Sequence, residues 1–241
     1  MEREAFLADY DAVLQKNGLN AYLACADAFF TLTERLLAAN AQFNLTAITD
    51  PHQIILRHYA DCLAIASDIP EGARVIDVGC GAGFPSLPLA VARPDLHITA
   101  LDSTAKKLRF VAECAGELGL TGLTVCNARA EEAAARPDMR ELFDVATARA
   151  VARLCVLDEL CLPFVRVGGL FLALKGENGA AEAAEAAKGV RILGGNAGSC
   201  TEIPITDGGE ILHHVLFRTE KVASTPEIYP RNYARICKKP L

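Results

Sequence analysis

The chain has 241 residues, of which 51% are apolar and 22% charged, and its net charge is −6. These proportions are ordinary for a folded protein and exclude an intrinsically disordered chain. No apolar run approaches the roughly 20 residues that a membrane-spanning helix needs, and the charged first ten residues argue against a signal peptide.

The nine cysteines are scattered, and none form a C-x-x-C pair that would suggest a metal site. Several lie inside apolar stretches, where a reduced thiol packs as a small hydrophobic group. We therefore expect reduced cysteines, a cytoplasmic location and no bound metal.

Residues 1–67 are predicted to form a helical region that packs on the core. In residues 20–39 the apolar side chains recur at helical spacing. A further helix is expected to begin at Pro51, with Asp50 as its N-cap.

Residues 68–241 are predicted to form one domain with alternating strands and helices. Strands are expected at 74–78, 96–101, 122–126, 143–147 and 170–174, and helices at 85–93, 105–118, 131–135 and 154–164. Such alternation predicts an α/β fold with a doubly wound, mostly parallel sheet. Two later runs, 190–193 and 211–219, are predicted to be its edge pair.

A glycine loop follows the first predicted strand. Asp77 precedes Gly79, Gly81 and Gly83, and Phe84 stands where a dinucleotide-binding loop needs a small residue. The G-x-G-x-G pattern is typical of S-adenosyl-L-methionine (adenosylmethionine) sites in the Rossmann-like class I methyltransferases. A nicotinamide dinucleotide is the disfavoured alternative.

The ends of the next two predicted strands supply further candidate cofactor contacts. Asp102 lies 23 residues after Gly79, about where a carboxylate accepts both ribose hydroxyls. The alternative is that Asp102 caps the following helix, but Ser103 can take that role. Ala130 and Glu131 follow the third strand and face the expected adenine position, although Glu131 can instead offset a helix dipole.

Arg149 closes the fourth predicted strand. An arginine at the carboxyl end of a central strand is costly to bury without a partner. We therefore favour a role in the site over a purely structural one.

Several strings along the chain resemble one family, the RsmG (GidB) methyltransferases. They are Asn44–Thr46, Arg57–Asp61, Asp77–Pro88, Asp102–Ser103, Lys106–Phe110, Ala148–Ala152, Leu174–Gly176 and Tyr229–Arg231. The family methylates N7 of a guanine in small-subunit ribosomal RNA. The resemblance implies that adenosylmethionine is the cofactor, bound by Gly79, Phe84, Ala130, Glu131 and Arg149, with Asp102 on the ribose.

The chain departs from the family pattern at three places. Ser86 stands where glycine is usual, and Ala148 where serine is usual. The tail after Tyr229-Pro230-Arg231 lacks the usual R-x-x-G-x-P string, which leaves its RNA contacts less defined.

Guanine N7 is a neutral lone-pair acceptor, so its methylation needs positioning more than a general base. Accordingly, no catalytic residue is assigned. His58, Lys106, Arg109 and Arg149 are candidates for positioning RNA, and Lys106 and Arg109 share a helix face. The alternative for Arg109 is an ion pair with Glu113. Further candidate cations are Arg57, Arg153, Lys175, Arg231, Lys238 and Lys239.

Two other functions stay open. The acidic balance, with a pI near 5.4, favours a methyltransferase for a small molecule or a protein. The third hypothesis is a non-catalytic, adenosylmethionine-binding ribosome-assembly factor. The excess of positive charge in residues 218–241 favours 16S ribosomal RNA or the small ribosomal subunit as partner. We expect a monomer with no obligate protein partner and no membrane contact.

Overall fold

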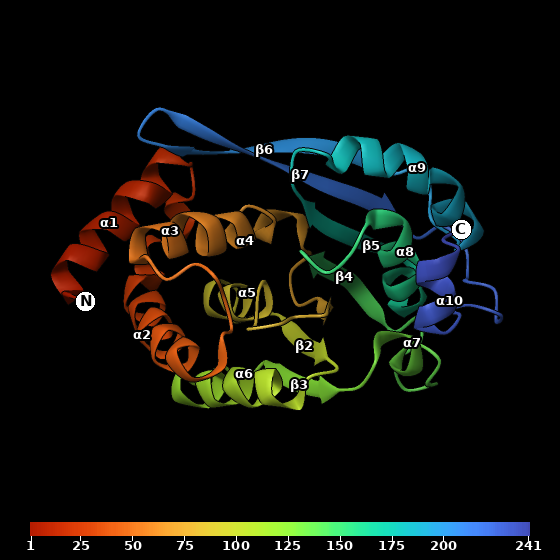
Figure 1. The fold of residues 1–241 in the computed structure, drawn as a ribbon, viewed down its shortest axis with the longest axis horizontal. Helices are drawn as coiled ribbons and strands as arrows, with labels where there is room; N and C mark the ends of the chain where they lie inside the picture. Colours follow the sequence, from red (N-terminus) through yellow and green to blue (C-terminus); the bar gives the residue numbers. More distant parts are fainter.

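The computed structural model describes the backbone of residues 1–241 and every side chain except that of residue 210. Its centre is a seven-stranded sheet in the order β3-β2-β1-β4-β5-β7-β6 (Figure 1). The strands are β1 Arg74–Val78, β2 His97–Asp102, β3 Leu123–Asn127, β4 Phe143–Arg149, β5 Val165–Lys175, β6 Ser199–Asp207 and β7 Glu210–Glu220. Strands β1 to β5 pair in parallel, whereas β7 is antiparallel to both neighbours. The predicted fold class is confirmed.

Helices precede the sheet, connect its strands and follow its last strand. They are α1 Arg3–Lys16, η1 Asn20–Cys25, α2 Ala26–Phe43, α3 Pro51–Ile54, η2 Ile55–Ala60, α4 Asp61–Leu63, η3 Ala66–Asp68, α5 Ser86–Ala92, α6 Ala105–Glu117, α7 Ala130–Ala133, α8 Leu154–Cys161, η4 Leu162–Phe164, α9 Gly179–Ile192 and α10 Tyr233–Lys238. The predicted start at Pro51 is confirmed, because the Asp50 side chain accepts a 2.9 Å hydrogen bond from the Gln53 N–H.

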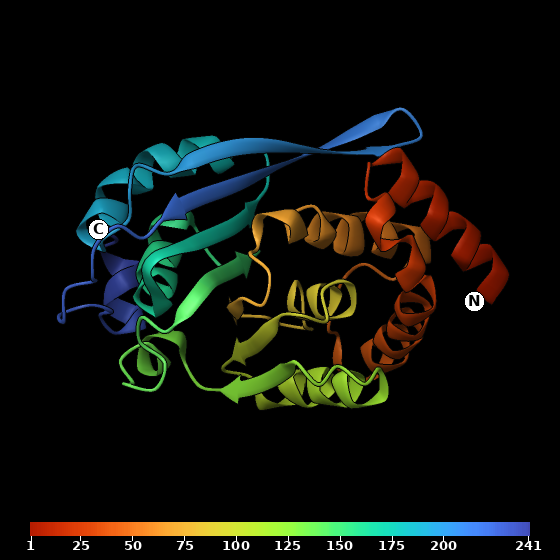
Figure 2. The same ribbon diagram turned by 180° about the vertical axis from the view of Figure 1, so that it is seen from behind.

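Both faces of the sheet are covered, which explains why its strands are apolar without alternation. Val75 of β1 faces a cluster that includes side chains of α2, α5 and α6. The next residue, Ile76, faces a second cluster built with α8 and α9. Figure 2 shows the same layers from behind.

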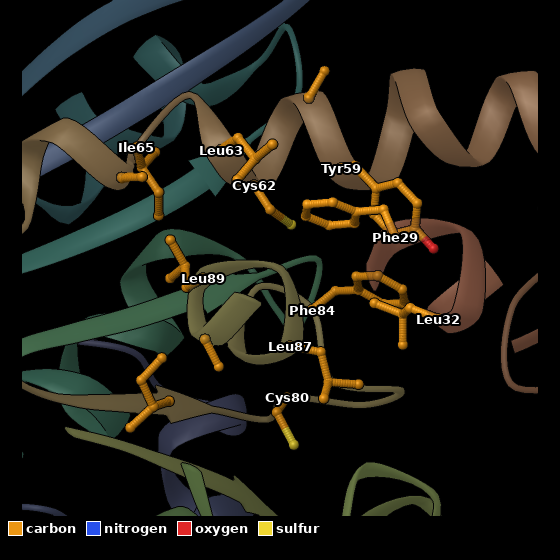
Figure 3. Close-up of a cluster of buried hydrophobic side chains, with 14 of the residues drawn as sticks. Phe29, Leu32, Tyr59, Cys62, Leu63, Ile65, Cys80, Phe84, Leu87 and Leu89 are labelled. Carbon is orange, nitrogen blue, oxygen red and sulfur yellow. The ribbon is translucent and has the colours of Figure 1, made fainter. Parts of the chain in front are cut away.

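The N-terminal helices pack on the first of these faces through aromatic side chains. Phe29 of α2 lies 4.5 Å from the Tyr59 ring, centroid to centroid, and Phe84 of the glycine loop packs beside Tyr59 (Figure 3). At the far end of the sheet, the β6–β7 hairpin reaches α1 (Figure 1). There Asn17 exchanges two hydrogen bonds with the Thr206 backbone. A division of the chain near residue 67 stays a prediction.

One predicted strand is wrong. Residues 190–193 were expected to be half of the edge pair, but they end α9 and its C-cap, and the true partner of β7 is β6. Val190 is buried one helical turn after Ala186, so its β-branched side chain serves helix packing. Among the described residues, no helix is long and apolar enough to cross a bilayer.

Candidate functional site

A cavity of about 530 Å³ opens at the carboxyl ends of β1 to β4. This is the edge where open parallel sheets bind ligands, and the volume suits a small-molecule site. We call it the first cavity. It is lined by Leu45, Thr46, His58, Val78–Ala82, Phe84, Leu101–Thr104, Lys107, Ala128–Glu131, Arg149–Val151, Leu160 and Tyr233.

The glycine loop forms the floor of the first cavity. Gly79 and Gly81 line it with φ angles of +73° and +59°, values that favour glycine. A Cβ on Gly79 would lie 2.9 Å from the Val151 side chain. Gly83 also has a positive φ, but it does not line the cavity. It instead lets the loop pack against Leu87 of α5, whose Cδ1 would lie 2.5 Å from an added Cβ.

Asp102 binds two backbone N–H groups at the cavity edge. Its Oδ2 accepts from Gly81 at 3.0 Å and its Oδ1 from Thr104 at 2.7 Å. Ser103 lines the cavity, but the Thr104 N–H donates to Asp102 and not to Ser103, contrary to our expectation. Each carboxylate oxygen keeps a further lone pair. The carboxylate can therefore orient the loop and still accept from a ligand's hydroxyl groups.

The opposite end of the cavity is built after β3. Ala130 and Glu131 line it in the first turn of α7, together with Ala128 and Arg129. Tyr233, from the C-terminal helix α10, faces the same space.

A stacked group of His58, Phe84 and Arg149 forms the inner wall. The His58 and Phe84 rings lie 4.5 Å apart at 21°, and the Arg149 guanidinium lies 5.3 Å from the Phe84 ring centroid. Arg149 donates to Asp61 Oδ2 at 3.1 Å and to the Arg57 carbonyl at 3.0 Å. Asp61 also bonds His214 of β7 through Oδ1, at 2.5 Å. Arg149 thus has the buried partner that its position requires.

The same wall holds His58 neutral. Burial, followed by the nearby Arg149 charge, lowers the pKa of His58 to about 4. Because Arg149 donates to His58 Nδ1 at 3.0 Å, the ring proton lies on Nε2 and points to Thr46 Oγ1, also at 3.0 Å. Although burial opposes it, hydrogen bonding to His214 and the Arg149 charge lower the pKa of Asp61.

A second cavity of about 450 Å³ lies beyond this wall, at the ends of β4 and β5. His58, Arg149 and Ala150 line both cavities. The other residues of the second cavity are Ile48, Arg57, Asp61, Leu174–Asn178, Glu182 and His214. Its charged side chains contrast with the backbone floor of the first cavity.

The loop between the two cavities is held in an unusual conformation. Ala150 has φ +54°, in the left-handed region that alanine rarely adopts. Lys175 Nζ donates to the Ala152 carbonyl at 2.7 Å and pairs with Glu182 at 2.9 Å. Glu182 also accepts from the Leu154 N–H at 2.7 Å. A strained backbone that several contacts hold in place is found mainly at functional sites.

Asp77 lies beneath the glycine loop and does not line the first cavity. Burial raises its pKa to about 6, although hydrogen bonds from the Ser86 hydroxyl and N–H oppose the rise. Ser86, one of the departures from the family pattern, therefore supplies this carboxyl with an additional donor.

The predicted cations have different positions. Lys106 Nζ lies 3.8 Å from the Phe43 ring centroid, and neither Lys106 nor Arg109 lines a cavity at the sheet edge. The proposed ion pair of Arg109 with Glu113 is not formed. Lys107 lines the first cavity, because it lies one turn before Val111 on the inward side of α6.

Other predicted cations are engaged in ion pairs. Arg153 pairs with Glu185, Lys175 with Glu182 and Arg231 with Glu159. Because these side chains already pair with carboxylates, they are less available to bind phosphate groups.

Sequence reasoning missed Lys107, Tyr233 and the pairing of Asp61 with His214. Helical phase in α6 could have identified Lys107. No local signal connects Asp61 with a histidine 153 residues later, because only the order of strands brings them together. In the part of the chain that the structure describes, no group of three metal-ligating side chains is found.

Comparisons with known proteins agree with this geometry. A model of the GidB family, described as rRNA small subunit methyltransferase G, matches residues 26–205. The ribosomal RNA small subunit methyltransferase G of Clostridium perfringens strain 13 is 41% identical, covering 88% of this chain and 89% of that protein. Its namesake from Geobacillus thermodenitrificans is 39% identical, covering 96% and 98%.

A solved structure supports the fold alone. The SAM-dependent O-methyltransferase of Thermotoga maritima superposes with a TM-score of 0.53 at 17% identity, covering 79% of this chain and 72% of that one.

Proposed function

Since the chain belongs to the GidB family, the rRNA small subunit methyltransferases G, we propose that it methylates N7 of a guanine in 16S ribosomal RNA with adenosylmethionine as donor. The observation that carries the proposal is the first cavity, with its glycine floor and the Asp102 carboxylate at its edge. The relatives' names point to ribosomal RNA as the substrate, and the residues that line the first cavity point to adenosylmethionine as the cofactor.

The residues of the first cavity fit adenosylmethionine. The glycine loop leaves room for the amino-acid portion close to the backbone. Asp102 accepts from the ribose hydroxyls with its remaining lone pairs, and Ala130 and Glu131 border the adenine. When bound, adenosylmethionine supplies an electrophilic methyl group.

In this proposal the acceptor guanine binds in the second cavity, on the other side of the shared wall. Arg57, whose guanidinium donates to Gln53 and not to a carboxylate, lines this space together with His214, which suits contact with an RNA strand. The positioning residues are Arg149 and Ala150, which lie between donor and acceptor and fix their approach.

The hydrogen bonding of the shared wall favours N7 over an amine or hydroxyl acceptor. The basic nitrogen of His58 is occupied by Arg149, and both oxygens of Asp61 already accept hydrogen bonds. An exocyclic amine or a ribose hydroxyl must lose a proton, whereas guanine N7 attacks as a neutral lone pair.

The test uses the whole chain with radiolabelled adenosylmethionine and unmethylated 16S RNA, both free and assembled into small subunits. Borohydride and aniline treatment then cleaves the RNA at 7-methylguanine. We expect label on RNA and a single cleavage site. Label only on small molecules or proteins would overturn the proposal, and binding without transfer would indicate an assembly factor.

A substitution of Asp102 tests the proposed cofactor site. Asp102→Ala removes a charged hydrogen-bond acceptor and should weaken adenosylmethionine binding by about 1–3 kcal/mol. Calorimetry measures the affinity. Affinity equal to that of the unmodified chain would show that Asp102 does not contact the ribose.

A further inference from the structure

The C-terminal segment returns to the cofactor side of the molecule. Helix α10 lies beside α7 and α8 (Figure 1). Its first residue, Tyr233, lines the first cavity together with Ala128–Glu131, where β3 leads into α7, and Leu160 of α8. A side chain from the end of the chain therefore completes a cavity whose floor is formed more than 150 residues earlier.

Strong contacts fix the path of this segment just before Tyr233. Glu159 is fully buried, and it accepts from the Arg231 N–H at 2.7 Å and from its guanidinium at 2.8 Å. Arg140 donates to the carbonyls of Thr225 and Tyr229, both at 2.8 Å. Charge-assisted bonds of this kind to a buried carboxylate are among the stronger contacts in proteins.

Helix α10 itself is held by an N-cap and by a buried side chain. The Asn232 side chain caps it by accepting from the Arg235 N–H at 2.9 Å. Ile236 is fully buried in the α8–α9 cluster. Tyr233, by contrast, keeps 40% of its surface exposed. The helix is anchored by Ile236 and Arg231, so the Tyr233 ring, whose hydroxyl lies near Cys237, is held at the cavity and stays partly exposed.

The position of Tyr233 identifies the part of the ligand that it meets. Under the proposed function, the glycine loop and Asp102 take the amino acid and ribose. The space beside Ala130 and Glu131 then belongs to the adenine. We propose that Tyr233 forms a wall of the adenine subsite and packs its ring against the purine, so that the C-terminal segment is part of the cofactor site.

This inference rests on the proposed function. It adds to the cofactor site a residue that lies outside the glycine loop, the ribose contact of Asp102 and the shared wall. Stacking of an aromatic ring on a base is strong enough that loss of the ring should weaken binding by roughly 5- to 150-fold.

Calorimetry with S-adenosylhomocysteine and with adenosine tests the proposal on the full chain. Tyr233→Ala should weaken both ligands by a similar factor, because they share the adenine. Tyr233→Phe keeps the ring and should stay within about twofold of the unmodified chain, given that the aromatic face supplies the contact. Arg235→Ala, an exposed change on the same helix, is the matched control and should leave both affinities unchanged.

The outcomes separate this inference from the proposed function. Unchanged affinities in Tyr233→Ala, with an unmodified chain that binds both ligands, would overturn the role of Tyr233 alone. A loss restricted to RNA binding would also overturn it, because Tyr233 would then contact the substrate. An unmodified chain that binds neither ligand would contradict the proposed function itself. The melting temperature without ligand checks that Tyr233→Ala remains folded.

Discussion

The two cavities at the sheet edge are built by different means. The first rests on backbone, with a glycine loop and strand ends that are local in sequence. The second rests on charged side chains that distant elements bring together, such as Asp61, Arg149 and His214. Among the residues whose side chains are described, His58, Arg149 and Ala150 are the ones that belong to both.

This difference separates two kinds of requirement. The first cavity needs backbone conformations that only certain residues adopt, so substitutions that add bulk should be the most destabilising there. The second needs its buried charges to be paired, so substitutions that remove a charge should be the most destabilising there. Three substitutions test this distinction.

The largest effect is expected from Asp61→Ala. It leaves the buried Arg149 guanidinium and His214 without their carboxylate. Removing one partner of a buried ion pair costs about 3–5 kcal/mol. Urea denaturation measures the free energy of unfolding. A loss below 1 kcal/mol would mean that the second cavity does not depend on this pairing.

A steric effect of about 2–4 kcal/mol is expected from Gly83→Ala, which combines an unfavourable φ of +87° with a contact of 2.5 Å to Leu87. The matched control is Gly176→Ala in the second cavity, where an added Cβ meets nothing within 4 Å. That change should stay within about 0.5 kcal/mol. Gly83 belongs to the glycine loop without lining the first cavity, so equal losses in the two variants would show that this loop is no more sensitive to added bulk than the second cavity is.

The smallest effect concerns pH and the shared wall. Because its pKa is lowered to about 4, folded His58 resists a proton that the unfolded chain binds below about pH 6.5. Stability from this residue is therefore present at pH 7 and is lost as pH falls toward 4. Between pH 7 and pH 5 the loss should be about 1–2 kcal/mol.

The variant His58→Asn isolates this contribution, since its amide oxygen can accept from Arg149 but does not titrate. Asp77, with its raised pKa, works in the opposite direction over part of the same range, but it is present in both proteins. Urea denaturation at both pH values should show a smaller pH effect in the variant. The same dependence in both would exclude His58 as its source.

Local sequence predicted most of the fold and the floor of the first cavity. The five parallel strands, the helix start at Pro51 and the glycine loop each follow from the chemistry of neighbouring residues. The misplaced edge strand shows the limit of this reasoning. Val190 and Ile192 favour a strand locally, but the alanine-rich stretch before them continues as α9.

The remainder depended on tertiary structure. The order of strands places His214 beside Asp61, and the anchors of the C-terminal segment place Tyr233 in the first cavity. A pattern of charges in the sequence could not show which cations are paired. Arg231 and Lys175 appeared suitable for RNA until their partners, Glu159 and Glu182, were seen.

The position of β7 has a consequence for biosynthesis. Strand β7 lies between β5 and β6, although it follows β6 in the chain. While a ribosome makes the protein, β5 therefore keeps an unpaired edge until residues 210–220 emerge. Strands β1 to β4 can associate before that, with the ends that bear the glycine loop. The second cavity thus gains His214 only when β7 emerges, and until then the open edge of β5 is the surface that chaperones must protect from aggregation.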